Sequence, residues 1–192
     1  NRPDLMKLKH FGAAAASSGG VELYHMPGIT PEAATLEDAF GPDDIPTAIV
    51  YGEAERRKTW ERLQNASERK LDFVMLGCPH NSIEQMSLIA ELLDGRKVHA
   101  DTALWVHTPR AIRQIADRSG YTAVIEAAGG VVMSDTCPSI SRKVPPGTRV
   151  VATDSAKQAH YLPAIAKVEG WFGSVSQCVE SAIAGEWLGV VQ

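Results

Sequence analysis

The chain has 192 residues, of which 44% are hydrophobic and 22% are charged, and its formal net charge is −4. This length suits one α/β domain or two small ones and allows a sizeable buried core. The hydrophobic content excludes a disordered chain, and the lack of a basic run argues against a nucleic-acid-binding surface. No apolar stretch reaches the ~18–20 residues that a membrane-spanning helix needs, so we expect no membrane contact.

The N-terminal sequence Asn-Arg-Pro-Asp-Leu-Met lacks the apolar core of a signal peptide and does not begin with Met. We therefore expect a piece of a longer protein. The three cysteines are odd in number and far apart, which is not the pattern of a disulfide scaffold. The odd number and the wide spacing of the cysteines favour a reducing, cytoplasmic setting.

The sequence predicts two parts: a partly helical N-terminal segment over residues 1–45, and an α/β domain over residues 46–192. In the second part, apolar runs of strand length alternate with helix-like segments. The runs are Thr47–Tyr51, Asp72–Leu76, Ala103–His107, Val131–Met133 and Arg149–Thr153. Such alternation predicts right-handed crossovers between parallel strands. We therefore expect a three-layer domain with a mostly parallel sheet and helices on both faces.

Helix boundaries are marked by local signals. The pattern Ser-x-x-Gln, which is typical of a capping box, begins at Ser82, Ser155 and Ser174. Thr108-Pro109 predicts a cap followed by proline at the first helical position. Helices are expected to stop near glycines, at Gly120, Gly129 and Gly185.

The unusual residues follow the expected strands. These segments are Gly77-Cys-Pro-His-Asn-Ser82, Ser134-Asp-Thr-Cys-Pro138 and Asp154-Ser-Ala-Lys157. A third cysteine, Cys178, lies early in the last expected helix. Because ligands of open α/β sheets bind beyond the carboxyl ends of the strands, we expect all of these segments to converge at one edge.

The residues alone leave three interpretations open for Cys78, Cys137 and Cys178: a metal site, buried structural cysteines, or a redox or nucleophilic cysteine. Two of them precede proline, which holds a loop open towards a ligand. Structural zinc sites usually contain close cysteine pairs, which are absent here. Three isolated cysteines fit three corners of an iron–sulfur cluster whose remaining iron is open to substrate.

Other signals have competing explanations. The backbone amides of Ser17-Ser18-Gly19-Gly20 could line an anion, or the segment could be a flexible turn. His80 could act as an acid, a base or a ligand, or be a hydrogen-bonded structural residue. Lys157 opens a helix directly after a strand, where free amides and its ammonium could bind an anion, or it could be solvated.

Four segments together resemble the aconitase X family: Lys9–Gly20, Gly77–Ser82, Asp135–Pro138 and Thr153–Lys157. The segment around Cys178 fits the same family. The resemblance covers essentially the whole chain but only about the C-terminal half of the family's large subunit. It implies that the N-terminal half and a small swivelling domain, as a separate subunit or a fused domain, are partners of this chain.

The resemblance implies an aconitase-like fold and an iron–sulfur-dependent hydro-lyase, or dehydratase, whose open iron binds the leaving hydroxyl of the substrate. The cluster ligands fall on Cys78, Cys137 and Cys178. The candidate catalytic residues are Ser17, Ser18 and His80, and the candidate substrate-binding residues are Asn81, Ser155 and Lys157.

Known family members dehydrate one of two small hydroxy acids, cis-3-hydroxy-L-proline or mevalonate 5-phosphate. The bacterial style of the sequence favours the first substrate. We expect the isolated segment to be inactive and able to lack its cluster, whose nuclearity the sequence does not determine. A zinc- or thiol-dependent binding domain is the alternative from a different class.

Overall fold

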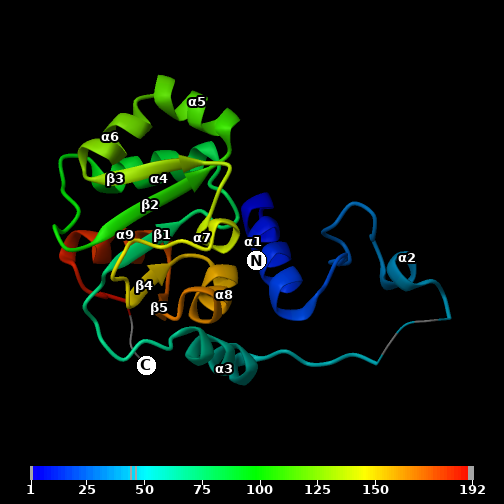
Figure 1. Cartoon of the computed structure of the whole chain (residues 1–192). Coiled ribbons are helices and arrows are strands. Elements are labelled where there is room, and N and C mark those ends of the chain that lie inside the picture. Colours follow the sequence, from blue (N-terminus) through cyan, green and yellow to red (C-terminus); the bar gives the residue numbers. More distant parts are fainter. Residues whose placement is uncertain (1, 44, 46, 190–192) are drawn as a thin grey trace. The chain divides into compact units, whose positions relative to one another are not determined.

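The computed structural model describes residues 2–43, 45 and 47–189 (Figure 1). The chain divides into two compact units, residues 1–59 and 60–192. The expected division at residues 45/46 falls inside the first unit, and residues 46 and 192, the ends of the expected α/β domain, lie outside the described residues. Within the described part of the chain, no helix combines the length and the apolar character needed to cross a bilayer.

The first unit is helical and has almost no core. It contains α1 (Leu5–Gly19), which begins at the side-chain cap Asp4, then α2 (Leu36–Phe40) and the start of α3 (Glu53–Leu63). Among the described residues of this unit, Ala33 is the only buried one. Since apolar burial is the main favourable term in folding, this unit has little to stabilise it by itself.

The strand expected at Thr47–Tyr51 does not form. The backbone there is irregular, and Ile49 and Val50 are 95% and 85% exposed. A strand needs a partner for its backbone N–H and C=O groups. The described residues of the first unit offer no strand for it to pair with, so the apolar run stays irregular and exposed.

The second unit contains a five-stranded parallel sheet in the order β3-β2-β1-β4-β5. Four of these strands match predicted ones, and β5, a short strand that contains Glu and Gly, was not predicted. The strands are β1 (Phe73–Leu76), β2 (Ala103–Thr108), β3 (Gly130–Ser134), β4 (Val150–Thr153) and β5 (Glu169–Phe172). The expectation of a parallel α/β sheet is confirmed.

Helices cover both faces of this sheet (Figure 1). One face packs against α4 (Ile83–Leu93), α5 (Arg110–Arg118), α6 (Tyr121–Ala127) and α9 (Val175–Ala184). The other face packs against α8 (Ala156–Ala166), next to which lies the short α7 (Pro138–Ser141). The predicted three-layer arrangement is therefore present.

Strand β1 shows why the sheet sits in the middle of the core. Its side chains alternate between the two faces: Val74 and Leu76 pack in the cluster with α4 and α9, whereas Phe73 and Met75 pack against Leu162 of α8. All four strand residues are fully buried. Burial of each such side chain stabilises the fold by about 1.5–3 kcal/mol, which anchors β1 at the centre.

Two of the three predicted capping boxes are complete. Ser82 opens α4 and Ser174 opens α9, each in reciprocal contact with the glutamine three residues on. At the start of α8, Ser155 accepts a hydrogen bond from the Gln158 amide, but the Gln158 side chain does not return to the cap. The glycines expected at helix ends all have positive φ, at Gly120, Gly129 and Gly185.

The predicted cap at Thr108 is wrong. Thr108 is the last residue of β2, and its hydroxyl donates to the Asn81 carbonyl at 2.9 Å. Pro109 stands at the N-cap of α5 without a side-chain cap, and the Arg110 amide donates instead to the Asp135 carboxylate at 2.9 Å. The loop after β3 thus supplies the cap of α5. This contact joins α5 to that loop at the carboxyl edge of the sheet.

We predict that Gly77→Ala is strongly destabilising. Gly77 has φ +95°, and a Cβ there would lie 2.2 Å from the His107 carbonyl oxygen and 2.5 Å from Asn81 Nδ2. The expected loss in free energy of unfolding is about 3 kcal/mol or more, because backbone strain and a backbone clash add. Chemical denaturation measures it.

The matched control is Gly147→Ala, at φ +83° with nothing within 4 Å of the added Cβ. It is expected to cost only about 1 kcal/mol, the conformational part alone. Equal losses for the two variants would show that the loop after β1 can move away from β2.

Candidate functional site

The loops after β1, β3 and β4 meet at the carboxyl edge of the sheet. Because β1 lies between β2 and β4, the direction of winding reverses at β1 and β4, and such switch points are where open α/β sheets bind ligands. The loop after β1 carries Cys78, the loop after β3 carries Cys137, and the loop after β4 carries Ser155. The predicted convergence of these three segments is therefore observed.

Cys78 and Cys137 form a thiol pair at this edge. Their side chains interact, and both are buried in the same cluster, 6% and 7% exposed. This interaction raises the pKa of Cys78 and lowers the pKa of Cys137. Backbone amides at the start of α7 also favour the Cys137 thiolate. The pair therefore concentrates negative charge on sulfur.

Further donors face Cys78. Gln158 Nε2 donates to the Cys78 sulfur at 3.0 Å, and the Ser155 side chain, like Gln158, lowers the pKa of the Cys78 thiol. Gln158 Oε1 accepts from the Ser139 hydroxyl at 2.9 Å, so its orientation is defined at both ends. Gln158 and Ser155 are fully buried. These contacts would stabilise a thiolate or a metal-bound sulfur at Cys78.

His80 lies beside the thiol pair. Its Nε2 is 3.0 Å from the Thr136 carbonyl oxygen, which can only accept, so this nitrogen carries a proton. His80 also lies near Cys137 and near the buried His107. Burial, together with the nearby His80, lowers the pKa of His107 to about 4, so His107 is neutral at pH 7. His80 is thus placed to act on a proton next to Cys137.

Asn81 connects the loop after β1 to the end of β2. Its backbone amide and its Nδ2 donate to the His107 carbonyl at 2.9 and 3.0 Å, and its side chain is fully buried. Its Oδ1 is buried and has no hydrogen-bond partner among the described residues. Asn81 therefore supports the loop and leaves one acceptor for a ligand.

Asp154 is a buried carboxyl that follows β4. One carboxylate oxygen lies 3.5 Å from the Gly77 amide, and the other has no partner among the described residues. Burial raises the pKa of Asp154 to about 6, against an ordinary value of 3.8. A carboxyl group that titrates near neutral pH at a switch point is a candidate acid or base.

Cys178 lies apart from the thiol pair. It is on α9, fully buried, in the cluster on the opposite face of the sheet. Burial raises the pKa of its thiol well above the usual value, and the charge of Asp154 adds to this. Among the described residues, no three His, Cys, Asp or Glu side chains form a group that could hold a metal ion. The structure thus brings together two of the three expected cluster ligands and leaves Cys178 in the core.

Ser17 and Ser18 belong to the first unit, where they occupy the last turn of α1. Their hydroxyls donate to the Ala13 and Ala14 carbonyls at 2.8 Å. The segment is therefore neither a loop that lines an anion with amides nor a flexible turn. Because the C-terminal end of a helix carries partial negative charge, the backbone there does not attract an anion.

Lys157 lies in the first turn of α8, two residues after the cap Ser155. Its Nζ is 6.0 Å from the centroid of the Tyr161 ring. Lys157 is half-buried, so its ammonium keeps access to solvent beside the loop after β4. The position at the start of a helix after a strand is the predicted one, and the anion-binding role of Lys157 stays a prediction.

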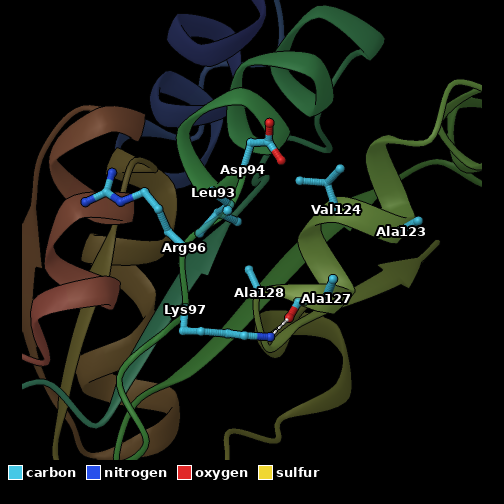
Figure 2. Close-up of a pocket in the computed structure, with 9 residues that line it drawn as sticks. Leu93, Asp94, Arg96, Lys97, Ala123, Val124, Ala127 and Ala128 are labelled. Atoms are coloured by element: carbon cyan, nitrogen blue, oxygen red, sulfur yellow. Dashed lines mark hydrogen bonds between the residues drawn. The ribbon is translucent and has the colours of Figure 1, made fainter.

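A pocket of about 370 Å³ lies at the opposite, amino-terminal edge of the sheet, and Figure 2 shows the residues that line it. It is lined by the segment after α4 and by α6, with Val124 and Ala128 on its wall. Lys97 donates to the Ala127 carbonyl, and Arg96 pairs with Glu180 outside the pocket. Both basic groups of the lining are thus already engaged, and the pocket lies away from the thiol pair.

Three residues of the site were not singled out from the sequence: Gln158, Asp154 and His107. The Ser-x-x-Gln pattern predicts that the Gln158 side chain closes a capping box, whereas this side chain donates to Cys78. Asp154 stands in the Thr153-Asp-Ser-Ala-Lys157 segment directly after a strand, which was the available signal. His107 had no sequence signal, since its role follows from burial beside the loop after β1.

The fold and the site define a doubly wound α/β domain with a thiol pair at its switch point. The family model described as aconitase X third domain matches residues 71–184, and that of the aconitase X second domain matches residues 1–61. The chain belongs to the aconitase X family.

Similar proteins differ in the substrates that their names give. A cis-3-hydroxy-L-proline dehydratase of Pseudomonas aeruginosa is 37% identical over 96% of this chain and 32% of its own length. A phosphomevalonate dehydratase large subunit of Methanocaldococcus jannaschii is 40% identical over 93% of this chain and 43% of its own. The chain spans less than half the length of each.

A solved structure also matches. The holo-form of Thermococcus kodakaraensis aconitase X superposes with a TM-score of 0.77 at 28% sequence identity, and the match covers 93% of this chain and 44% of that one. The α/β architecture of the chain is therefore that of the family.

We predict that Asp154→Asn stabilises the protein at pH 7. Because the folded-state pKa is raised, Asp154 favours folding when protonated, and this contribution is lost as the pH rises from about 4 through about 6. The substitution should raise the free energy of unfolding by up to about 3 kcal/mol at pH 7. Denaturant titrations at pH 4 and pH 7 measure the difference, which should nearly vanish at pH 4.

The control is Asp101→Asn, since the Asp101 side chain is 65% exposed and only 3.9 Å from Lys70 Nζ. It should change stability by no more than about 0.5 kcal/mol at either pH. An Asp154→Asn variant that gains nothing at pH 7 would mean that the carboxylate has a partner in the protein.

Proposed function

We propose that the chain supplies the cysteine-bearing half of the active site of an iron–sulfur-dependent dehydratase. The observation that carries this proposal is the thiol pair of Cys78 and Cys137 at the switch point, with hydrogen-bond donors directed at sulfur. The dehydratase names of the relatives support the reaction class.

The cluster site is proposed to use Cys78 and Cys137 from this chain. Cys178 does not fit the same site, because it is buried on the other face of the sheet. Iron–sulfur clusters need more than two protein ligands, so the remaining ligands would come from outside this chain. When bound, such a cluster supplies a Lewis acid for the leaving hydroxyl of the substrate.

The side chains of this chain would bind and orient the substrate. The start of α8, with Ser155 and Lys157, suits a substrate carboxylate. Asn81 offers its free Oδ1 to a substrate donor. His80 holds a proton at Nε2 next to Cys137 and is a candidate acid, and Asp154 is a candidate base because its pKa is about 6.

Ser17 and Ser18 remain proposed catalytic residues on the strength of the family resemblance. Each hydroxyl donates within α1 and keeps its lone pairs free to accept. A direct role in proton transfer would require the hydroxyl to leave its helix carbonyl.

We propose cis-3-hydroxy-L-proline as the substrate, with mevalonate 5-phosphate as the second candidate. The support is divided, since the chain is 37% identical to a dehydratase of the first compound and 40% identical to a dehydratase named for the second. Anaerobic assay of the full-length protein with both compounds decides between them.

The proposed partners are the rest of the large subunit and a small swivelling domain, in the cytoplasm. The chain by itself is expected to show no turnover. The alternative function is a zinc- or thiol-dependent binding domain, which the same thiol pair could serve. Stoichiometric zinc and a colourless protein would favour this alternative.

We predict different outcomes for the three cysteines. In the full-length protein, Cys78→Ala and Cys137→Ala should each lower bound iron and sulfide more than about tenfold and abolish absorbance near ~400 nm, because each removes a ligand. Cys178→Ala should keep the iron and lose only some stability. Metal analysis after anaerobic purification measures this. Iron loss in Cys178→Ala, with the fold intact, would restore Cys178 as a ligand.

We predict that Lys157→Met lowers kcat/KM at least ~10-fold, because a charge-assisted hydrogen bond contributes about 1.5–3 kcal/mol. Steady-state kinetics of the full-length protein measure the effect. The matched control is Lys167→Met at the exposed opposite end of α8, which should leave kcat/KM unchanged. Equal kinetics for both variants would place the anion contact elsewhere.

A further inference from the structure

Three helices of the second unit begin with the same Ser-x-x-Gln pattern, but one of them behaves differently. At α4 and α9, the side chain of Gln85 or Gln177 accepts a hydrogen bond from the amide of its capping serine. At α8, Gln158 leaves this position, and the Ser155 amide donates to Thr153 Oγ1 at 3.2 Å instead. Of these three helices, α8, which borders the thiol pair, is thus the one whose glutamine side chain does not close the capping box.

Both ends of the Gln158 side-chain amide make hydrogen bonds within the candidate site. Its Nε2 donates to the Cys78 sulfur at 3.0 Å, its Oε1 accepts from the Ser139 hydroxyl at 2.9 Å, and it is fully buried. Ser139 belongs to α7, which directly follows Cys137. The Gln158 side-chain amide is therefore held by the loop that carries Cys137. A buried amide held at both ends has little freedom to turn away from sulfur.

We propose that Gln158 is a positioning residue that donates an N–H···S hydrogen bond to the Cys78 ligand and thereby sets the electron density on that sulfur. This inference rests on the proposed function. Hydrogen bonds to ligand sulfur withdraw negative charge and favour the reduced cluster, so they raise the reduction potential. Gln158 would not touch the substrate; it would act through Cys78.

The test compares Gln158→Met with Gln177→Met in the full-length protein. Both variants remove an amide from the third helical position, but the Gln158 side chain donates to a cysteine sulfur, whereas the Gln177 side chain accepts from the amide of its own cap, Ser174. Redox titration followed by electron paramagnetic resonance measures the cluster potential. We expect a more negative potential in Gln158→Met and the wild-type potential in Gln177→Met.

Ser139→Ala provides a second measurement if Gln158→Met does not retain its cluster. It removes the contact to Oε1 but keeps the N–H donor, so a smaller shift in the same direction is expected. If Gln158→Met and Ser139→Ala both keep the wild-type potential, the inference is overturned and the proposed function stands. If Gln158→Met holds no cluster, an unchanged potential in Ser139→Ala has the same meaning. A wild-type protein that binds no iron overturns the proposed function and this inference with it.

Discussion

The site depends on how the loop of residues 77–81 is held between two neighbouring strands. On one side, Asn81 donates twice to the His107 carbonyl at the end of β2, at 2.9 and 3.0 Å. On the other side, the Gly77 amide faces the Asp154 carboxylate after β4. This double attachment is possible because β1 lies at the centre of the sheet, and it requires Gly77, since any Cβ would meet the His107 carbonyl. The position of Cys78 follows from these constraints.

Charge is distributed unevenly around this loop. The neighbouring Cys78 thiol and the amides at the start of α7 lower the pKa of Cys137 and so favour negative charge on its sulfur. Burial has the opposite effect on Asp154 and His107: it raises the pKa of the carboxyl to about 6 and lowers that of the imidazole to about 4. Because a buried ion is costly without partners, His107 is neutral at pH 7 and the ionised form of Asp154 is destabilised, whereas the donors at this edge favour negative charge on sulfur.

The two units differ in how much apolar surface each buries within itself. The sheet of the second unit is buried on both faces, whereas Ala33 is the only buried residue among those described in the first unit. Ile49 and Val50 are almost fully exposed there. The relatives named above are more than twice as long as this chain.

The sequence alone determined most strands and helix starts of the second unit. The alternation of strands and helices and the caps at Ser82 and Ser174 are local signals, and the packed structure keeps them. The sequence also placed Cys78 and Cys137 at one edge, since parallel strands end on the same side. Tertiary structure alone decided that Cys178 faces the opposite core and that Gln158 turns to Cys78. A sequence pattern shows that a helix has a buried face, but the rotation and neighbours of that helix decide which groups its side chains meet.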